Sequence, residues 1–241
     1  MGSVGGRRAR EVVLAALQSE TAPEVVASLF TALGTLRGED SFAKLRAEAR
    51  QGSRDVYLSG LALENLGKTR SAEDLDLLMA HLKPVGDWAD WRWQRALLGL
   101  GWSRQLSAVD VLVDHLSEEY PQKVRATAAL ALGRLAKHHD SVKERAREAL
   151  CLDLESKGMR VQLGHIGGLV ALGDVGAVPA LQRLRPEASD GRVMRVAYEA
   201  CVRLRNAPDG HKAVTAEVEA LREKLEALTT RLDRLEHPKV Q

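Results

Sequence analysis

The sequence predicts an all-α protein, an α-solenoid of about six helix pairs followed by a C-terminal heptad helix. A Leu-Gly dipeptide recurs at intervals of 33, 34, 32 and 40 residues, a period typical of stacked helix pairs. Aromatic residues make up 4% of a chain that is 45% hydrophobic, which suits close helix packing better than a β-sandwich. The dipeptides are Leu33-Gly34, Leu66-Gly67, Leu100-Gly101, Leu132-Gly133 and Leu172-Gly173.

Each Leu-Gly closes an apolar helical stretch, and we expect its glycine to take the left-handed conformation that ends a helix. The first helices of the pairs are expected at 8–19, 40–50, 71–82, 107–118, 141–156 and 175–185. The second helices are expected at 23–37, 54–66, 88–101, 121–136, 158–172 and 191–205. Ser71, Ser107 and Ser141 each stand three residues before an acidic residue, as in a capping box, and are expected to cap first helices.

The chain divides into a flexible N-terminus at 1–6, the solenoid at 7–205, a breaker-rich linker at 206–212, an amphipathic helix at 213–236 and a tail at 237–241. Apolar residues of the amphipathic helix alternate spacings of four and three, which predicts a coiled-coil-like seam. The seam residues are Val214, Val218, Leu221, Leu225, Leu228, Leu232 and Leu235. This helix either caps the last repeat of its own chain, which we favour, or forms a homodimer with a second chain.

Two phrases of the chain resemble HEAT repeats: VRATAALALG at 124–133 and GDVGAVPAL at 173–181. The resemblance implies a right-handed, armadillo-like helical solenoid whose second helices line the concave side. More narrowly, the span from Arg7 to Glu236 resembles the C-terminal HEAT-like region of bacterial zinc aminopeptidases of the aminopeptidase-N type. The catalytic H-E-x-x-H motif and G-x-M-E-N-type loop of that family are absent here, so the resemblance implies a non-catalytic accessory domain or a stand-alone relative.

No catalytic residue, metal site or cofactor is expected. The seven histidines are scattered, without the i and i+4 spacing of a zinc helix, and are expected at the surface or at helix ends. Cys151 and Cys201 are expected to be small buried hydrophobic residues. The glycines of 164–168 fall within an expected helix, where close packing explains them better than a phosphate-binding loop does.

The four tryptophans fall within fifteen residues of the sequence. Trp93 shares a helical face with Leu97 and Leu100, which predicts a place in the core. Trp91, Arg95 and Trp102 follow a different stripe, which has the composition of an anchoring patch for a partner, although these rings could instead fill the seams between repeats. The candidate partner-binding residues are Trp88, Trp91, Arg92, Arg95, Trp102, Arg125 and Arg134.

Charge is sorted between the two kinds of helix, although the net charge is only +2. Windows around the second helices hold 17 lysine and arginine residues against 7 acidic ones, whereas windows around the last five first helices hold 9 against 17. The HEAT resemblance therefore implies a basic concave face. It also implies that Arg125, Arg160 and Arg195 pair with neighbouring repeats, which reduces the charge left for a ligand.

These observations favour a non-catalytic protein-binding scaffold, whose partner is the catalytic domain of the same enzyme or another protein. The alternative is a nucleic-acid binder or a HEAT-like DNA-alkylation glycosylase, because Asp87 and Asp90 stand beside tryptophans in a basic setting. No apolar run approaches the ~20 residues of a membrane span, and no signal peptide is evident, so no membrane partner is expected. Two cysteines without a disulfide pattern favour the cytoplasm.

Overall fold

The computed structural model describes residues 3–51, 56–83, 89–155, 158–184 and 190–207. These ranges contain twelve α-helices, three short 3-10 helices and no strand, which confirms the all-α prediction. The α-helices are α1 (Ser3–Ser19), α2 (Pro23–Leu36), α3 (Glu39–Gln51), α4 (Val56–Leu66), α5 (Glu73–Met79), α6 (Ala89–Ser103), α7 (Ala108–Asp114), α8 (Gln122–Ala136), α9 (Asp140–Leu152), α10 (Met159–Leu172), α11 (Val178–Gln182) and α12 (Gly191–Asn206). The 3-10 helices are η1 (Gly67–Thr69), η2 (Asp153–Glu155) and η3 (Val175–Ala177).

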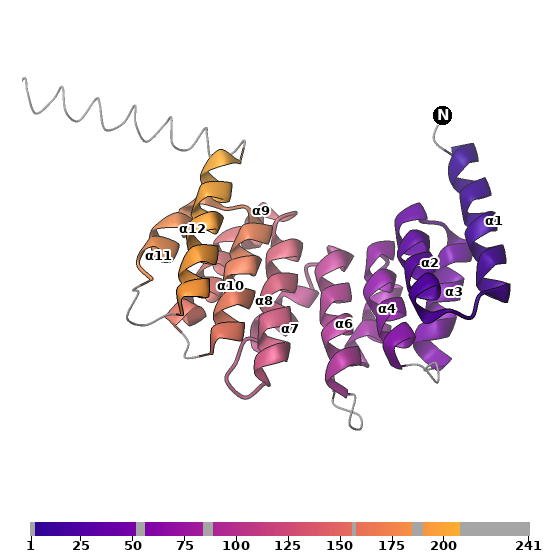
Figure 1. The fold of residues 1–241 in the computed structure, drawn as a ribbon, viewed down its shortest axis with the longest axis horizontal. Helices are drawn as coiled ribbons and strands as arrows, with labels where there is room; N and C mark the ends of the chain where they lie inside the picture. Colours follow the sequence, from indigo (N-terminus) through magenta and orange to yellow (C-terminus); the bar gives the residue numbers. More distant parts are fainter. Residues whose placement is uncertain (1–2, 52–55, 84–88, 156–157, 185–189, 208–241) are drawn as a thin grey trace, which may run out of the picture.

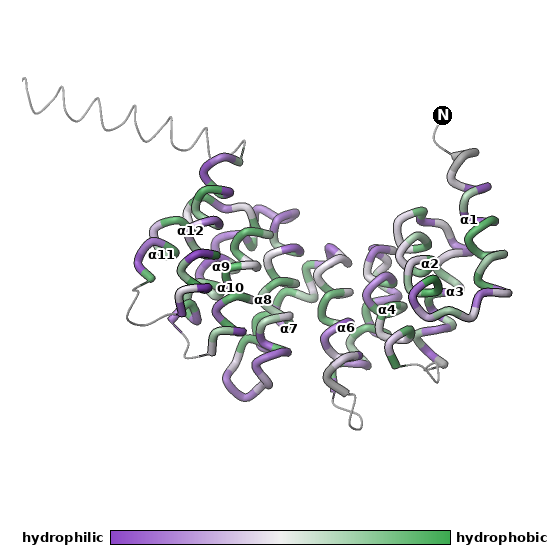
Figure 2. The backbone as a smooth tube through the Cα atoms, in the orientation of Figure 1, coloured by the Kyte–Doolittle hydropathy of each residue, from purple (hydrophilic) through white to green (hydrophobic). Residues whose placement is uncertain are grey.

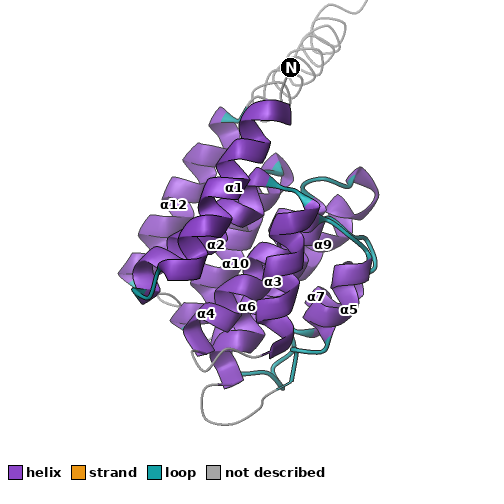
Figure 3. Ribbon diagram, turned by 90° about the vertical axis from the view of Figure 1, so that its right-hand side faces the viewer, coloured by secondary structure: helices purple, strands orange, loops and turns teal. Residues whose placement is uncertain are grey.

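The helices form two layers. The even-numbered helices α2, α4, α6, α8, α10 and α12 pack side by side in this order, and we call them the even row (Figure 1). The odd-numbered helices α3, α5, α7 and α9 lie together on the other side of the molecule (Figure 3). The even row corresponds to the second helices of the expected pairs, and α1 begins at Ser3, within the segment 1–6 that was expected to be flexible.

A continuous hydrophobic core fills the space between the two layers, from Ala27 in α2 to Leu204 in α12. Leucine and alanine are the most frequent residues of this core. In α8, for example, Ala128, Leu132 and Leu135 are completely buried. Hydrophobic and hydrophilic residues alternate along the helices as an amphipathic pattern requires (Figure 2). The scarcity of aromatic residues allows the helix axes to come close together.

The repeated glycines have a different role from the expected one. Only Gly173 takes the left-handed conformation, with φ of 75°; Gly133 lies inside α8 and Gly67 begins η1. A Cβ atom on Gly67 would overlap the carbonyl group of Gly99, and one on Gly133 would overlap that of Gly168. Gly67, Gly101 and Gly133 therefore mark places where neighbouring even-row helices touch through their backbones, and Gly34 packs against the Asn65 side chain. Gly173 alone of the five ends its helix, α10, in the left-handed conformation, as expected.

The left-handed residues that follow the first three even-row segments are arginines. Arg37, Arg70 and Arg104 have φ of 49°, 60° and 57°, and each stands three residues after the glycine of its Leu-Gly dipeptide. The backbone reverses at these arginines to begin the next odd-numbered helix. A left-handed conformation costs a residue with a Cβ atom about 1 kcal/mol, so these turns are strained.

The expected capping boxes do not form. Ser71 accepts a bond of 3.3 Å from the backbone N–H of Glu73, but the carboxylate of Asp74 binds the Thr69 hydroxyl and Arg46 instead. Ser107 makes no capping bond with its side chain, and α9 begins after His139 without one. Both α5 and α7 are shorter than the helices expected at 71–82 and 107–118. Packing of their apolar faces, rather than capping, holds these short helices in place.

Candidate functional site

The outward side of α6 carries the tryptophan stripe. The Trp91 ring stacks on the Tyr57 ring of α4, with centroids 5.4 Å apart and planes 22° from parallel. The Arg95 guanidinium lies 4.0 Å from the Trp91 centroid and donates a charge-assisted hydrogen bond to Glu64 of α4. The stack of Tyr57, Trp91 and Arg95 therefore joins α4 to α6, and the charge of Arg95 is already balanced.

Trp102, near the C-terminal end of the same helix, lies between two cations. Trp102 is 36% exposed. Lys68 Nζ lies 5.7 Å from the centroid of its ring, and the Arg134 guanidinium carbon lies 4.7 Å from the same centroid. Lys68 also donates a hydrogen bond of 2.7 Å to Asn65. Trp102 thus presents a partly open indole that is held between η1 and α8.

Of the cations near Trp91 and Trp102, Arg134 has the fewest acceptor groups to balance its charge. Burial lowers its pKa, and Glu64 attracts it only from a distance. Its Nη1 atom is buried without a hydrogen-bond partner in the described part of the chain, and no carboxylate there lies within ion-pair distance. Because a half-buried guanidinium without an acceptor is costly, Arg134 favours an incoming anionic group.

A groove of about 320 Å³ continues from Arg134 across α8, α10 and α12. Leu130, Leu163, Val170 and Val196 give it an apolar lining. Arg134, Arg203 and Glu199 supply its polar groups. The indole of Trp102 and this groove therefore share Arg134, and together they form one surface, which we call the Trp102–Arg134 surface.

Other candidate residues have structural roles. Arg125, expected to contact a partner, is only 6% exposed and donates to the Leu116 carbonyl (3.0 Å) and to Asp153 (2.8 Å), so it holds neighbouring repeats together. Arg92 reaches the Ala49 carbonyl, and burial lowers its pKa. Trp88 lies outside the described residues.

Two further arginines, Arg160 and Arg195, were expected to pair with neighbouring repeats. Both are exposed, and Arg195 pairs within its own helix with Glu199, at 3.9 Å. Arg125 alone among the three links two repeats. The pairing therefore removes less positive charge from the even row than the HEAT resemblance implies.

Trp93 belongs to the core, as predicted. It is 5% exposed and meets the rings of His115 and Tyr120 edge-on, with both centroids 5.7 Å away. The seam residues Val214, Val218, Leu221, Leu225, Leu228, Leu232 and Leu235 lie outside the described residues.

Two histidines are buried: His165 lies inside α10, contrary to the expectation of a surface or helix-end position, whereas His115 stands at the C-terminal end of α7, a helix end as expected. His115 is 6% exposed and His165 is completely buried. His165 Nδ1 lies 2.9 Å from the Leu150 carbonyl oxygen, and Nε2 lies 3.8 Å from the Asp153 carboxylate that Arg125 binds. Burial is the main cause that lowers the pKa of His165. No group of three or more metal-ligating side chains occurs in the described ranges.

Neither cysteine lines the groove of the Trp102–Arg134 surface. Cys201 is buried and Cys151 is half-buried, and burial raises the pKa of both thiols. Cys201 therefore matches the expected small buried hydrophobic residue, and Cys151 does so only in part. Gly164 and Gly168 of the glycine-rich stretch pack against Ala126 and Ala129 of α8, as close packing predicts.

The structure also brings together a set of basic side chains that sequence reasoning missed. Arg37, Arg70 and Arg104, with Lys137 and His138, occupy the four turns that follow α2, η1, α6 and α8, and we call them the basic edge. The pKa of Arg70 is lowered by burial and then by the charges of Arg104 and Arg37, so the side chains share one electrostatic field. The constant distance of Arg37, Arg70 and Arg104 from the Leu-Gly dipeptides is the signal that could have revealed these three arginines.

Neighbouring repeats hold the turns of the basic edge. The Arg37 guanidinium donates to the Thr69 carbonyl at 3.1 Å, and the Gln105 amide donates to the Arg70 carbonyl at 2.8 Å. His139 Nε2 lies 2.9 Å from the Arg104 carbonyl oxygen. The turns at Arg70 and Arg104 are therefore each fixed by a side chain from a neighbouring turn.

No protein-family model and no curated protein matches this chain. None of the helices in the described ranges combines the length and the apolar character needed to cross a bilayer.

Proposed function

We propose that this chain is a non-catalytic, HEAT-like α-solenoid that binds an extended protein segment on its Trp102–Arg134 surface. The observation that carries the proposal is Arg134, a half-buried cation without a carboxylate partner in the described residues, placed between an open indole and an apolar groove. A segment with one acidic side chain followed by apolar side chains satisfies all three features at once.

The geometry of Trp102 favours a protein ligand. Tryptophan and arginine are the residue types that most often dominate binding energy at protein interfaces. Trp102 is held by cations on both sides, so little conformational entropy is lost when a ligand covers it. The groove beside it has an apolar lining that phosphate-dominated recognition does not need.

The resemblance to the C-terminal region of aminopeptidase-N-type zinc peptidases suggests one source for this segment. In that case the ligand belongs to the catalytic part of the same enzyme, and this chain is its accessory domain. A stand-alone scaffold would take the same kind of segment from another protein. Both arrangements rest on the same surface, so one binding experiment tests the surface in either case.

Selection from a displayed library of random peptides tests the proposal. We expect enriched sequences to combine an acidic residue with apolar residues, and Arg134→Ala or Trp102→Ala to weaken their binding about tenfold or more, which corresponds to ~1.4 kcal/mol. The matched control is Arg145→Ala, which removes an exposed arginine from the odd-numbered helix α9. Peptides that bind the wild-type protein and all three variants equally would disprove the role of this surface.

The basic edge favours a second candidate function, binding of a nucleic acid. Its basic side chains occupy four consecutive turns, and burial, followed by the positive charges of Arg104 and Arg70, lowers the pKa of His138. A single-stranded oligonucleotide would bind with an affinity that falls steeply with salt, and Arg70→Glu with Arg104→Glu would abolish that binding. Peptide binding to the Trp102–Arg134 surface should change little with salt, so the two functions separate in one titration.

A further inference from the structure

Among the residues that the structure describes, the last even-row helix, α12, has a neighbour in the row on one side only. Each even helix from α4 to α10 packs between two others, whereas α12 packs on α10 and α11. On its other side Tyr198 is 72% exposed and Val202 is 38% exposed. Two large hydrophobic residues one turn apart are therefore left uncovered by the described part of the chain at the end of the row.

The exposed face of α12 corresponds to the face on which an inner even-row helix packs against the following even-row helix. The two helices can be aligned by their buried residues. Val124, Ala128 and Leu132 of α8 then align with Val193, Ala197 and Cys201 of α12. On this match Ala129 and Gly133 correspond to Tyr198 and Val202. Both α8 residues are buried where α10 packs: a Cβ atom on Gly168 of α10 would overlap the Ala129 carbonyl, and Gly133 touches Gly168 itself.

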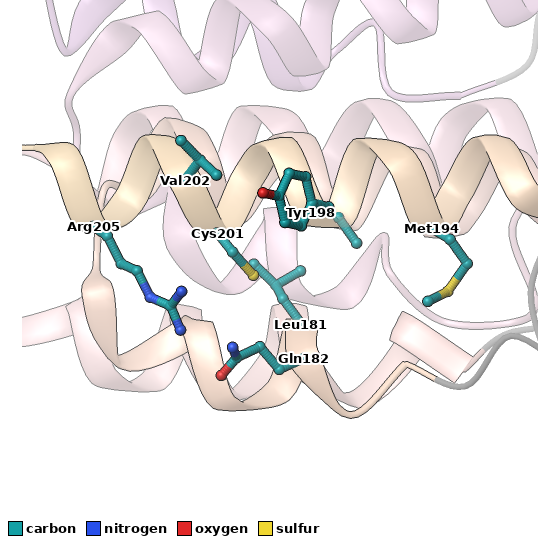
Figure 4. A pocket seen from close by; sticks show the side chains of 8 residues that line it. Leu181, Gln182, Met194, Tyr198, Cys201, Val202 and Arg205 are labelled. Carbon is teal, nitrogen blue, oxygen red and sulfur yellow. The ribbon is translucent and has the colours of Figure 1, made fainter.

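A groove of about 310 Å³ marks this face between α11 and α12. Leu181 of α11 and Met194, Tyr198, Cys201 and Val202 of α12 line it, and Arg205 lies at its C-terminal end (Figure 4). The side chains of Met194, Tyr198, Val202 and Arg205 follow one another along α12 (Figure 4). The groove thus has the direction of a helix that lies along α12.

The size of these side chains limits what can fill the groove. Inner even-row helices touch through glycine and alanine, but tyrosine and valine at the same positions keep an incoming helix farther away. A helix at larger separation fills the space only with long side chains such as leucine. This excludes another helix of the glycine-rich even-row type, including one from a second copy of the chain.

We propose that residues 214–235 of the same chain fill this groove as a helix that runs back along α12. The seven seam residues Val214, Val218, Leu221, Leu225, Leu228, Leu232 and Leu235 repeat at the spacing that gives one apolar stripe on a helix. Residues 207–213 join α12 to this segment, a length usual for connections between packed antiparallel helices. A helix of this length spans about 33 Å, enough to cover the length of α12 at about 24 Å.

The charges of this segment and of α12 favour an antiparallel arrangement of the two helices. The first thirteen residues of the segment, 214–226, carry Glu217, Glu219, Glu223 and Glu226 against Arg222 and Lys224 and form its acidic half. A returning helix places this acidic half beside the C-terminal end of α12, where Arg203 and Arg205 stand. Opposite charges at the rim of an apolar contact fix the direction of packing more than they add affinity.

Hydroxyl-radical footprinting of the full chain, read by mass spectrometry, tests this cap. We compare the wild type with Leu221→Asp/Leu228→Asp, which breaks the seam, and with Ala220→Asp/Ala227→Asp, which adds the same charge outside it. Modification of Tyr198 and Met194 should rise about threefold or more in the seam variant only, because an exposed ring replaces a covered one. Modification of Trp102 should stay constant in all three proteins, which shows that the repeats remain folded.

A second variant changes the groove instead of the segment and so tests the same contact from the other side. Val202→Asp in the groove should speed hydrogen exchange of the backbone amides of 214–235, although no residue of that segment is changed. Equal Tyr198 modification in the wild type and the seam variant would overturn the proposal. So would protection that disappears on dilution together with a dimer seen by light scattering, because the groove would then hold the segment of a second chain.

Discussion

Trp91 and Trp93 stand two residues apart on α6 and have opposite environments. Their helical positions differ by 200°, so Trp93 enters the core beside His115 while Trp91 stacks outside on Tyr57. This difference follows from helical periodicity, which is why the sequence predicted both positions. Periodicity did not predict His165 or Arg125, because their burial depends on a partner, Asp153, that lies in another element.

Replacement of single tryptophans should separate folding from binding. Trp93→Ala removes a ring that is 5% exposed and should lower the free energy of unfolding by about 3–5 kcal/mol. Trp102→Ala removes a ring that is 36% exposed and should cost less than about 1.5 kcal/mol while it weakens peptide binding. Urea denaturation of both variants measures the difference, and equal losses would place Trp102 in the core.

His165 should make the protein less stable in mild acid. Burial holds its pKa below the value of about 6.5 that the unfolded chain has. As the pH falls from 7 to 5, the unfolded state therefore takes up a proton that the folded state excludes, and the free energy of unfolding decreases. His165→Gln keeps a donor for the Leu150 carbonyl and should flatten this pH dependence in urea titrations. His138→Gln, at an exposed position, is the control and should change the dependence less.

At the scale of the element, the sequence predicted where helices lie better than how they end. The expected second helices agree with the even row to within a few residues, because their apolar faces and breakers are both local signals. The role of the glycines could not be predicted from one helix, since a backbone contact depends on the neighbouring helix. The turn residues Arg37, Arg70 and Arg104 show the same limit, because tertiary packing imposes their left-handed conformation.

Two glycines of the even row should respond differently to alanine. A methyl group on Gly133 would overlap the Gly168 carbonyl, so Gly133→Ala should lower the free energy of unfolding by about 2 kcal/mol or more. A Cβ atom on Gly167 would lie 3.8 Å from the nearest other atom, Leu130 Cδ1, so Gly167→Ala should be neutral or stabilise by up to about 1 kcal/mol. Thermal or urea unfolding of the pair compares them, and equal effects would contradict the backbone contact.

The strain of the arginine turns is also measurable. Arg70→Gly removes the Cβ atom from a residue with φ of 60°, so it should be more stable than Arg70→Ala by about 1 kcal/mol. Both variants lose the same charge, so the comparison isolates the backbone conformation. A glycine variant no more stable than the alanine variant in urea unfolding would show that the turn carries no strain.

At the scale of the whole molecule, the helices contact mainly their neighbours along the row. Packing of this kind makes stability a sum of local terms, so the ends should open before the middle. We expect hydrogen exchange of backbone amides to be slowest in α8 and α10 and faster in α2. Mass spectrometry of peptic peptides measures this gradient, and uniform protection along the row would show that the molecule unfolds as one unit.

The position of Arg134 has a spectroscopic consequence. Its guanidinium lies 4.7 Å from the Trp102 ring and also lines the groove across α8, α10 and α12. A carboxylate that draws Arg134 into the groove changes the electric field across an indole that the ligand need not touch. The emission wavelength of Trp102 would then report occupancy of the groove, and the protein would carry its own fluorescent reporter without a label.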